Sequence, residues 1–402
     1  MNKNILFLSS SYMDIDSDSG LYTELIQQLK KNVNVKVVAP SFENNKKGLY
    51  DEGGVDVIRV PFFNFFNKNP LLKGIKQVLM PIMFYIYLTK YMKNWDIDWV
   101  IMPTPPITLS PLVYFLKKKF DAKFYLILRD IFPQNAVDMG FIRKPSLLYA
   151  IFRRIERFTY GLSDAIGCMS KANVDYLIKK NKFLDPDLIY LLENWGSKLN
   201  IIDKNSALVK NIDKKKFKVL FGGNLGIPQN TEFLIDVASK IKSDSRFEFI
   251  IIGTGTEKNK IQKKISDNNL KNVKLVNKVS RDKYQLILKE ADLGLVLLNK
   301  NFTIPNVPSR LIAYWSASLP VLAATDRFTD VNSSFLKPNS TGLWVEMGDI
   351  EAFIDCLYFF LENPVQTREM GIRGRDLISK KYTSDVASDK LLHQLGLIDH
   401  AL

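Results

Sequence analysis

The chain has 402 residues, of which 46% are hydrophobic and 24% charged, and its formal net charge is +14. One hydrophobic core rarely holds this many residues and the composition excludes a disordered chain, so we expect a globular protein of two domains. Two cysteines, Cys168 and Cys356, exclude a disulfide framework and fit a reducing compartment. The only histidines, His393 and His400, lie in the last ten residues, so a histidine-based triad or metal site has no support.

Apolar runs alternate with helical patterns along the first half of the chain. The runs are NILFLSS, VNVKVVAP, WVIMPT and KFYLILRD. Near-continuous apolar runs followed by helices indicate parallel strands that are covered on both faces. The first run, Ile5 to Leu8, is too short for a signal peptide and fits a buried strand.

Two DxD pairs occur in the first half, at Asp16 with Asp18 and at Asp96 with Asp98. A metal-dependent transferase can use such a pair, but short DxD matches are frequent by chance. With no CxxC or HExxH spacing in the chain, we expect no bound metal.

Residues 61–95 combine nine aromatic residues with five lysines and no acidic residue. Their uninterrupted apolar run, Val78 to Leu88, is too short to span a bilayer. Lysines around an aromatic stretch favour peripheral binding to an anionic membrane. The alternative is a helix buried between strands with exposed ends, and both interpretations can hold at once.

The segment LRDIFPQNAVDMG ends a predicted buried strand with Arg129 and Asp130. Ligands of parallel sheets bind at the carboxyl ends of the strands. The pair is therefore a binding site or a structural ion pair. We favour the site, with Asp130 as the best-placed carboxylate of the first domain.

The domain boundary is expected in the polar, lysine-rich stretch 196–217. This gives an N-terminal domain of residues 1–195 and a C-terminal domain of residues 218–384. The last helix, within about 385–402, is expected to fold back on the first domain.

The second half opens with FGGNLG, residues 221–226, after a predicted strand. Gly222, Gly223 and Gly226 let the backbone approach a ligand and direct N–H groups at it, although a tight turn without a ligand gives the same pattern. The later IIGTGTE lacks the third glycine of the dinucleotide fingerprint and is better explained as a plain turn.

The stretch IPNVPSRLIAYWSASLPVLAATD predicts a loop, a helix and a strand at Leu319 to Ala323. Ser309 is expected to cap the helix, and Arg310 lies in its first turn. A helix start with an arginine favours a bound anion such as a diphosphate. The alternative is a structural cap with a solvated arginine.

Taken in order, five motifs resemble a known family over nearly the whole chain. They are MPTPPITLSPL, LRDIFPQNAVDMG, GNLGIPQN, VPSRLIAYWSASLPVLA and TGLWVEMGD. The chain resembles the GT-B glycosyltransferases of family 4, in particular the branch of N-acetyl-L-fucosamine transferases of O-antigen and capsule assembly. The resemblance implies an α/β fold of two Rossmann-like doubly wound domains facing across a cleft, with the donor held by the second and the acceptor by the first.

The resemblance also implies roles for single residues. Asp130 and Arg310 are the expected catalytic residues. The expected donor-binding residues are Gly222, Gly223, Asn224, Gly226, Pro308, Ser309 and Arg310. On the acceptor side the expected residues are Ser19, Gly20, Arg129 and Asp130, with Ser19 standing where the family has a first glycine. The family's two glutamates align with Pro305 and Ala313, so both carboxylates are absent here.

The expected function is transfer of a sugar, with retention and without a metal or cofactor, from a UDP-sugar to a lipid-linked oligosaccharide. The enzyme is expected in the cytoplasm, bound to the inner face of the cytoplasmic membrane through residues 61–95. No nucleic-acid partner is expected. Because the glutamates are missing, a GT-B scaffold or regulatory partner without catalysis is the alternative. A sugar-nucleotide epimerase is less well supported, because the sequence shows no clear set of acid–base carboxylates.

Overall fold

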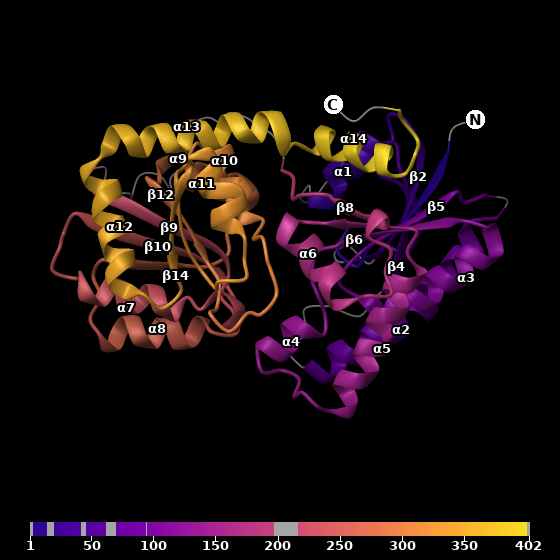
Figure 1. The fold of residues 1–402 in the computed structure, drawn as a ribbon, viewed down its shortest axis with the longest axis horizontal. Helices are drawn as coiled ribbons and strands as arrows, with labels where there is room; N and C mark the ends of the chain where they lie inside the picture. Colours follow the sequence, from indigo (N-terminus) through magenta and orange to yellow (C-terminus); the bar gives the residue numbers. More distant parts are fainter. Residues whose placement is uncertain are drawn as a thin grey trace. The chain divides into compact units, whose positions relative to one another are not determined.

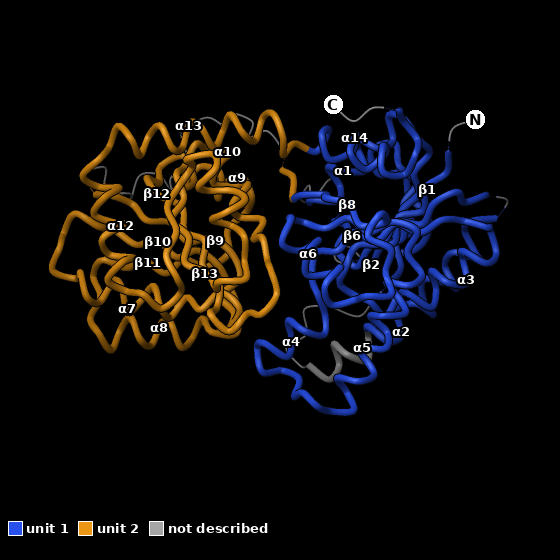
Figure 2. The backbone as a smooth tube through the Cα atoms, viewed as in Figure 1, with its two compact units in different colours: residues 1–193, 384–402 blue, residues 194–383 orange. Residues whose placement is uncertain are grey.

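The computed structural model describes residues 3–13, 20–41, 46–61, 70–93, 95–196 and 216–399. It divides the chain into two compact units, Met1–Glu193 with Ser384–Leu402, and Asn194–Thr383 (Figure 2). Most of the expected linker lies outside the described residues, because 197–215 are not described. The assignment of an acceptor to the first unit and a donor to the second stays a prediction.

The described strands of the first unit form one sheet of eight, in the order β3-β4-β2-β1-β5-β6-β7-β8. The strands are β1 (Asn4–Leu8), β2 (Asn34–Ser41), β3 (Gly48–Asp51), β4 (Asp56–Pro61), β5 (Trp99–Pro103), β6 (Lys123–Leu128), β7 (Ala165–Cys168) and β8 (Ile189–Leu191). Neighbours pair in parallel except the edge strand β3, which pairs antiparallel with β4. Central strands such as β5 are buried along their whole length, as expected for a sheet covered on both faces.

The α-helices described in the first unit are α1 (Leu21–Leu29), α2 (Pro70–Tyr91), α3 (Ser110–Phe120), α4 (Gln134–Asp138), α5 (Leu147–Leu162), α6 (Lys171–Lys180) and α14 (Ser384–Gln394). Although α14 comes from the end of the chain, it packs against α1 (Figure 1). The Lys390 Nζ atom lies 2.7 Å from a carboxylate oxygen of Glu193, and Gln394 bonds to the hydroxyl of Tyr125. The last helix is thus tied to the first unit.

Helix α2 is buried on one face only. Met80, Phe84 and Leu88 are buried at a spacing of four, whereas Val78 and Ile82 are 63% and 56% exposed. The expectation of a helix buried between strands is therefore wrong for the outer face of α2, and residues 62–69 lie outside the described residues. Within the described ranges, no helix combines the length and apolarity that a bilayer crossing needs.

The described strands of the second unit form a parallel sheet of six, in the order β11-β10-β9-β12-β13-β14. The strands are β9 (Phe217–Asn224), β10 (Phe247–Thr254), β11 (Val273–Val276), β12 (Leu293–Leu297), β13 (Val321–Thr325) and β14 (Gly342–Glu346). The helices are α7 (Glu232–Lys240), α8 (Lys258–Asp267), α9 (Arg281–Glu290), α10 (Arg310–Ser316), α11 (Lys337–Asn339), α12 (Ile350–Glu362) and α13 (Pro364–Lys381). Figure 1 shows α7 and α8 on one side of this sheet and α10 and α13 on the other.

In each sheet the strand order reverses once. The first sheet grows outward from β1 through β2 and then continues on the other side of β1 with β5. The second grows from β9 through β10 and β11 and then continues beside β9 with β12. This is the doubly wound arrangement, so the expected α/β fold class of two Rossmann-like units is confirmed.

Candidate functional site

The site in the second unit lies where the strand order of its sheet reverses. The carboxyl end of β9 leads into a single turn at Ile227–Gln229, and the carboxyl end of β12 leads to Asn299. Asn299 joins the two loops, because its backbone N–H donates to the Pro228 carbonyl (2.8 Å) and its side chain donates to the Ile227 carbonyl (3.1 Å). Gly222 and Gly223, which were expected in a turn after the strand, are the last part of β9. Ligands of open parallel sheets bind at this reversal point, so the glycines at the carboxyl end of β9 lie where a ligand is expected.

Three glycines in this loop region are required by close packing. A Cβ atom on Gly222 would lie 2.1 Å from the Tyr284 hydroxyl, and one on Gly223 would lie 3.1 Å from Nη2 of Arg310. A Cβ atom on Gly253, near the end of β10, would lie only 1.8 Å from the carbonyl oxygen of Gly223, its ladder partner in β9. Gly253 thus has the structural role of letting β10 pair closely with the glycines of β9.

The other two loop residues, Asn224 and Gly226, are held by Gln229. The Gln229 side-chain oxygen accepts the Gly226 N–H and the Asn224 side-chain N–H, each at 3.3 Å. Asn224 is exposed and Gly226 is buried. The Gly226 N–H is thus already committed within the protein, and the exposed Asn224 is the better placed of the two to meet a ligand.

Arg310, the first residue of α10, places its guanidinium over the ring of Phe221, with 4.3 Å from Cζ to the ring centroid. Its Nη1 atom is shielded from solvent and has no hydrogen-bond partner among the described residues. Burial lowers the pKa of this guanidinium, and the neighbouring Tyr314 and Tyr284 oppose that shift. A shielded guanidinium group without a carboxylate beside it is costly by itself, and a bound anion would offset that cost.

Two tyrosines that sequence reasoning missed fix the glycine turn. The buried Tyr314 hydroxyl accepts the Gly222 N–H at 3.2 Å and donates to the Leu220 carbonyl at 3.3 Å. Tyr284 on α9 forms a hydrogen bond with Tyr314. The available signal was the spacing of four between Arg310 and Tyr314, which places both on one face of α10.

Ser309 directly precedes α10, but its expected capping role is wrong. Its dihedral angles are helical (φ −59°, ψ −21°), and its side chain makes no capping hydrogen bond. The N–H groups of Leu311 and Ile312 donate instead to the carbonyls of Pro308 and Ser309, so a tight first turn satisfies them. Since α10 has only seven residues, the Arg310 side chain rather than the helix end is the candidate group for holding an anion.

The loop that carries Pro308 is anchored at two points within the second unit. The Asn194 side chain donates to the Val307 carbonyl at 2.7 Å, and the Asn306 N–H donates to the Thr329 hydroxyl at 3.3 Å. Thr329 in turn donates to the buried Asp326 at 2.8 Å. These contacts hold the backbone on either side of Pro308.

Asp326 is a buried carboxylate of this region, and its oxygens accept hydrogen bonds from within the protein. Its Oδ1 atom accepts the N–H groups of Phe328 and Thr329, both at 2.8 Å. Burial raises the pKa of the Asp326 carboxyl, and these hydrogen bonds oppose the shift. Asp326 therefore anchors the loop, and it does not replace the glutamates missing at Pro305 and Ala313.

In the first unit, Thr104 organises the predicted Arg129–Asp130 pair. Its hydroxyl, just after β5, accepts the N–H groups of Arg129 (2.9 Å) and Asp130 (3.2 Å), just after β6. Arg129 also forms a side-chain hydrogen bond with Tyr22 on α1, and α1 begins directly after Gly20. The structure thus brings Gly20, Arg129 and Asp130 to the carboxyl edge of the first sheet, whereas Ser19 lies outside the described residues.

Burial shifts the ionisation of both members of this pair. The pKa of the Arg129 guanidinium is lowered by burial, and the pKa of the Asp130 carboxyl is raised by burial, with Arg129 opposing that rise. A carboxylate with a raised pKa is a stronger base near neutral pH than an exposed one. The Arg129–Asp130 pair is therefore a candidate catalytic group, and it also makes a structural contact.

The DxD pair at Asp96 and Asp98 lies away from these strand ends. Asp98 immediately precedes β5, where it accepts the Asn4 N–H (2.8 Å) and pairs with Lys3 (2.7 Å). These contacts give Asp98 a structural role at the amino ends of β1 and β5. Asp16 and Asp18 lie outside the described residues. Over the part of the chain that the structure describes, no three His, Cys, Asp or Glu side chains cluster as metal ligands.

Known proteins that are similar in sequence to this chain are named as glycosyltransferases. Residues 203–377 match the family model described as "Glycosyl transferases group 1". WbjE of Pseudomonas aeruginosa, named as a probable glycosyltransferase, is 25% identical over 66% of this chain and 66% of its own. WcaI of Escherichia coli K12, named for colanic acid biosynthesis, is 21% identical over 65% of this chain and 66% of its own. The chain thus spans just under two thirds of the length of these curated relatives.

Solved structures cover nearly the whole chain. Sucrose-phosphate synthase from Thermosynechococcus elongatus superposes with a TM-score of 0.78 at 15% identity, covering 98% of this chain and 99% of its own. Anabaena HepE in complex with UDP gives 0.68 at 13% identity, covering 99% and 100%. The fold is that of the GT-B glycosyltransferases, and residues 203–377, less than half of the chain, are similar to the group 1 glycosyl transferases.

Proposed function

We propose that this group 1 glycosyl transferase moves a sugar, with retention, from a UDP-sugar to a lipid-linked glycan during bacterial surface polysaccharide assembly. The observation that carries the proposal is the environment of the Arg310 guanidinium. Its Nη1 atom is shielded from solvent without a hydrogen-bond partner among the described residues, and the guanidinium lies over Phe221 of β9, at the strand-order reversal of the second sheet. An anion of the size and charge of a nucleotide diphosphate suits this position.

The proposed mechanism uses charge stabilisation in place of the missing glutamates. The bond between the donor sugar and the diphosphate breaks, and an acceptor oxygen bonds to the same sugar carbon on the same face. The departing diphosphate takes the acceptor proton. Arg310 and the exposed Asn224 stabilise the charge that develops on the leaving group. No step in this scheme needs a carboxylate at Pro305 or Ala313.

Asp130 is proposed to orient the acceptor or to assist in removing its proton. Its raised pKa and its place at a strand end support this role. The lipid-linked acceptor and a location at the inner face of the cytoplasmic membrane belong to the same proposal, and the name of WcaI, which refers to colanic acid biosynthesis, supports its polysaccharide part.

Replacing Arg310 by alanine tests the proposal. Loss of a charge-assisted hydrogen bond to phosphate should weaken UDP-sugar binding by about ten- to a hundredfold, or roughly 1.5–3 kcal/mol. Calorimetry with the purified chain measures affinity, and released UDP measures turnover. Arg327→Ala is the matched control, because Arg327 is 75% exposed and pairs with Glu346 on the surface. Asp98→Ala should also bind normally.

Unchanged donor binding in a folded Arg310→Ala protein would contradict the diphosphate role. Ala313→Glu should restore little activity, because the site already functions without that carboxylate. The missing glutamates also favour a second candidate, a GT-B scaffold without catalysis. A wild-type chain that releases no nucleotide from any UDP-, GDP- or dTDP-sugar, with lipid-linked acceptors present, would favour that scaffold.

A further inference from the structure

Exposed apolar side chains gather on three helices of the first unit. Of the 19 large hydrophobic side chains that are exposed in the described part of the chain, 11 lie on α2, α3 and α5. Leu147 on α5 is 79% exposed, and Val78 on α2 is 63% exposed. A concentration of this kind on a folded unit marks an interaction surface.

The three helices form one continuous surface, which we call the apolar face. Helix α3 packs against both α2 and α5, and Figure 1 shows the three together. Partly exposed rings bridge the helices: Tyr85 and Phe115 have centroids 5.0 Å apart, and Tyr114 and Phe158 have centroids 6.0 Å apart. The apolar face thus extends from α2 across α3 to α5 without a break.

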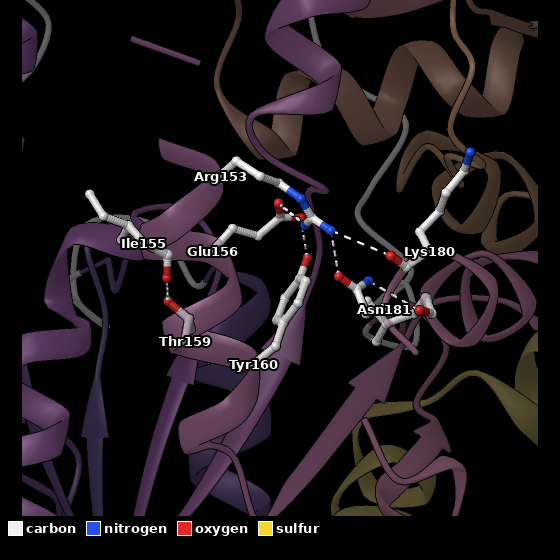
Figure 3. A network of polar contacts seen from close by, with 8 residues as sticks. Arg153, Ile155, Glu156, Thr159, Tyr160, Lys180 and Asn181 are labelled. Carbon is white, nitrogen blue, oxygen red and sulfur yellow. Dashed lines mark hydrogen bonds and ion pairs between the residues drawn. The ribbon is translucent and has the colours of Figure 1, made fainter. Parts of the chain in front are cut away.

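The orientation of α5 is fixed by polar contacts on its inner side (Figure 3). Glu156 is buried, accepts the Tyr160 hydroxyl at 2.9 Å and pairs with Arg153. Arg153 also donates to Asn181, after α6, at 2.7 Å. The Thr159 hydroxyl lies 2.5 Å from the hydroxyl of Ser110 on α3. The helix therefore turns polar groups toward the protein.

The outer side of α5 carries an apolar stripe. Leu147, Ile151 and Phe158 follow at spacings of four and seven, so they lie along one side of the helix, and all three are exposed. Arg154 is exposed within this stripe, between Ile151 and Phe158, and Arg157 is exposed beside it. A surface helix of a soluble protein normally shows the opposite arrangement, with its apolar side inward.

The charges of the apolar face have one sign. The sequences of α2, α3 and α5 contain a single acidic residue, the buried Glu156. Their exposed charged side chains in the described part are Lys90, Lys118, Lys119, Arg154 and Arg157. A second copy of this chain is a poor occupant, because a two-fold contact would set these cations against one another.

We propose that the apolar face docks on an anionic lipid bilayer, with apolar side chains among the headgroups and the cations at lipid phosphates. This membrane proposal deepens the proposed function. It rests on that function in one respect only, namely that a lipid-linked acceptor would bring the chain to a membrane. It adds α3 and α5 to the segment 61–95 expected from sequence, and it fixes which side of α2 meets the lipid.

Vesicle flotation of the full chain tests the proposal. The wild type should float with vesicles that contain phosphatidylglycerol and stay in solution with pure phosphatidylcholine. Arg154→Glu with Lys118→Glu should weaken the partition coefficient at least 25-fold, at about fivefold for each basic residue. Leu147→Ser with Ile151→Ser should also lose binding, because both apolar side chains leave the stripe.

Matched controls lie on α13 of the second unit. Val365 and Ile372 are 71% and 46% exposed, close to the 79% and 47% of Leu147 and Ile151. Val365→Ser with Ile372→Ser, and Arg375→Glu with Lys380→Glu, should float like the wild type. Thermal melting checks that each variant is folded.

Equal flotation with both vesicle types, no flotation with either, or an equal loss in the α13 controls would overturn the proposal. UDP-sugar binding without vesicles is measured on the same proteins and should not change in the α5 variants. If the wild type floats but binds no donor, the proposed function fails while the membrane face stands. If it binds donor but does not float, the membrane proposal fails while the proposed function stands.

Discussion

Replacing Tyr314 by phenylalanine isolates one hydroxyl on which the glycine turn depends. That hydroxyl accepts the N–H of the buried Gly222 at 3.2 Å and donates to the Leu220 carbonyl at 3.3 Å. Phenylalanine keeps the ring and removes both bonds. Because Tyr314 is 0% exposed, water cannot easily reach the Gly222 N–H.

The expected cost follows from that unpaired N–H. A buried donor left without a partner costs roughly 1–3 kcal/mol in the free energy of unfolding. For a unit the size of Asn194–Thr383, this lowers the melting temperature by about 2–10 °C. UDP-sugar affinity should fall too, because Gly222 begins the turn that meets the proposed ligand.

Differential scanning calorimetry and donor titration measure the two effects. Tyr358→Phe is the control, because the Tyr358 hydroxyl donates to Asp244 at 3.2 Å near the surface, where water can replace it. The control should change the unfolding free energy by less than about 1 kcal/mol. If Tyr314→Phe melts and binds donor like the control, the hydroxyl does not support the turn and our reasoning is refuted.

Two further predictions concern the metal and the pH dependence. We expect transfer to continue in the presence of a chelator, since Arg310 and not a metal stabilises the proposed leaving group. Loss of turnover with EDTA that Mn²⁺ restores would contradict this prediction and make Asp16 and Asp18 candidate metal ligands. Burial raises the pKa of Asp130 above its ordinary 3.8, so its contribution to stability is complete below that value and is lost as the pH rises through the raised pKa. Asp130→Asn should remove this loss and melt above the wild type near neutral pH, and identical melting curves from about pH 4 to 7 would contradict it.

The strands and the glycine loop could be predicted from sequence because their signals are local. A run such as FIIIG, residues 249–253, is apolar without interruption, and that pattern alone indicates a strand covered on both faces, as β10 proves to be. The glycines were expected to form a turn after such a strand, whereas the structure keeps Gly222 and Gly223 paired within β9, at its carboxyl end. Arg310 was found in the same way, from its place at the start of a short helix.

The partners of these residues could not be predicted, because contacts between distant segments depend on strand order. Tyr314 meets Gly222 only because β12, which leads to α10, lies beside β9 in the sheet. Thr104 meets Arg129 only because β5 and β6 are neighbours. Ser309 failed as a cap for a related reason, since its turn is set by Pro308 and by the loop anchored at Asn194 and Thr329.

The apolar face shows most clearly which features are local in the sequence and which depend on contacts between distant segments. The sequence by itself determined that the region of α2 is aromatic, apolar and rich in lysine, because residue type is a local property. It did not determine which side of each helix faces solvent. Only the tertiary structure decided that, because Arg153 on α5 bonds to Asn181 after α6 and Thr159 on α5 bonds to Ser110 on α3. With these residues turned toward the protein, Leu147, Ile151 and Phe158 lie on the outer side of the helix.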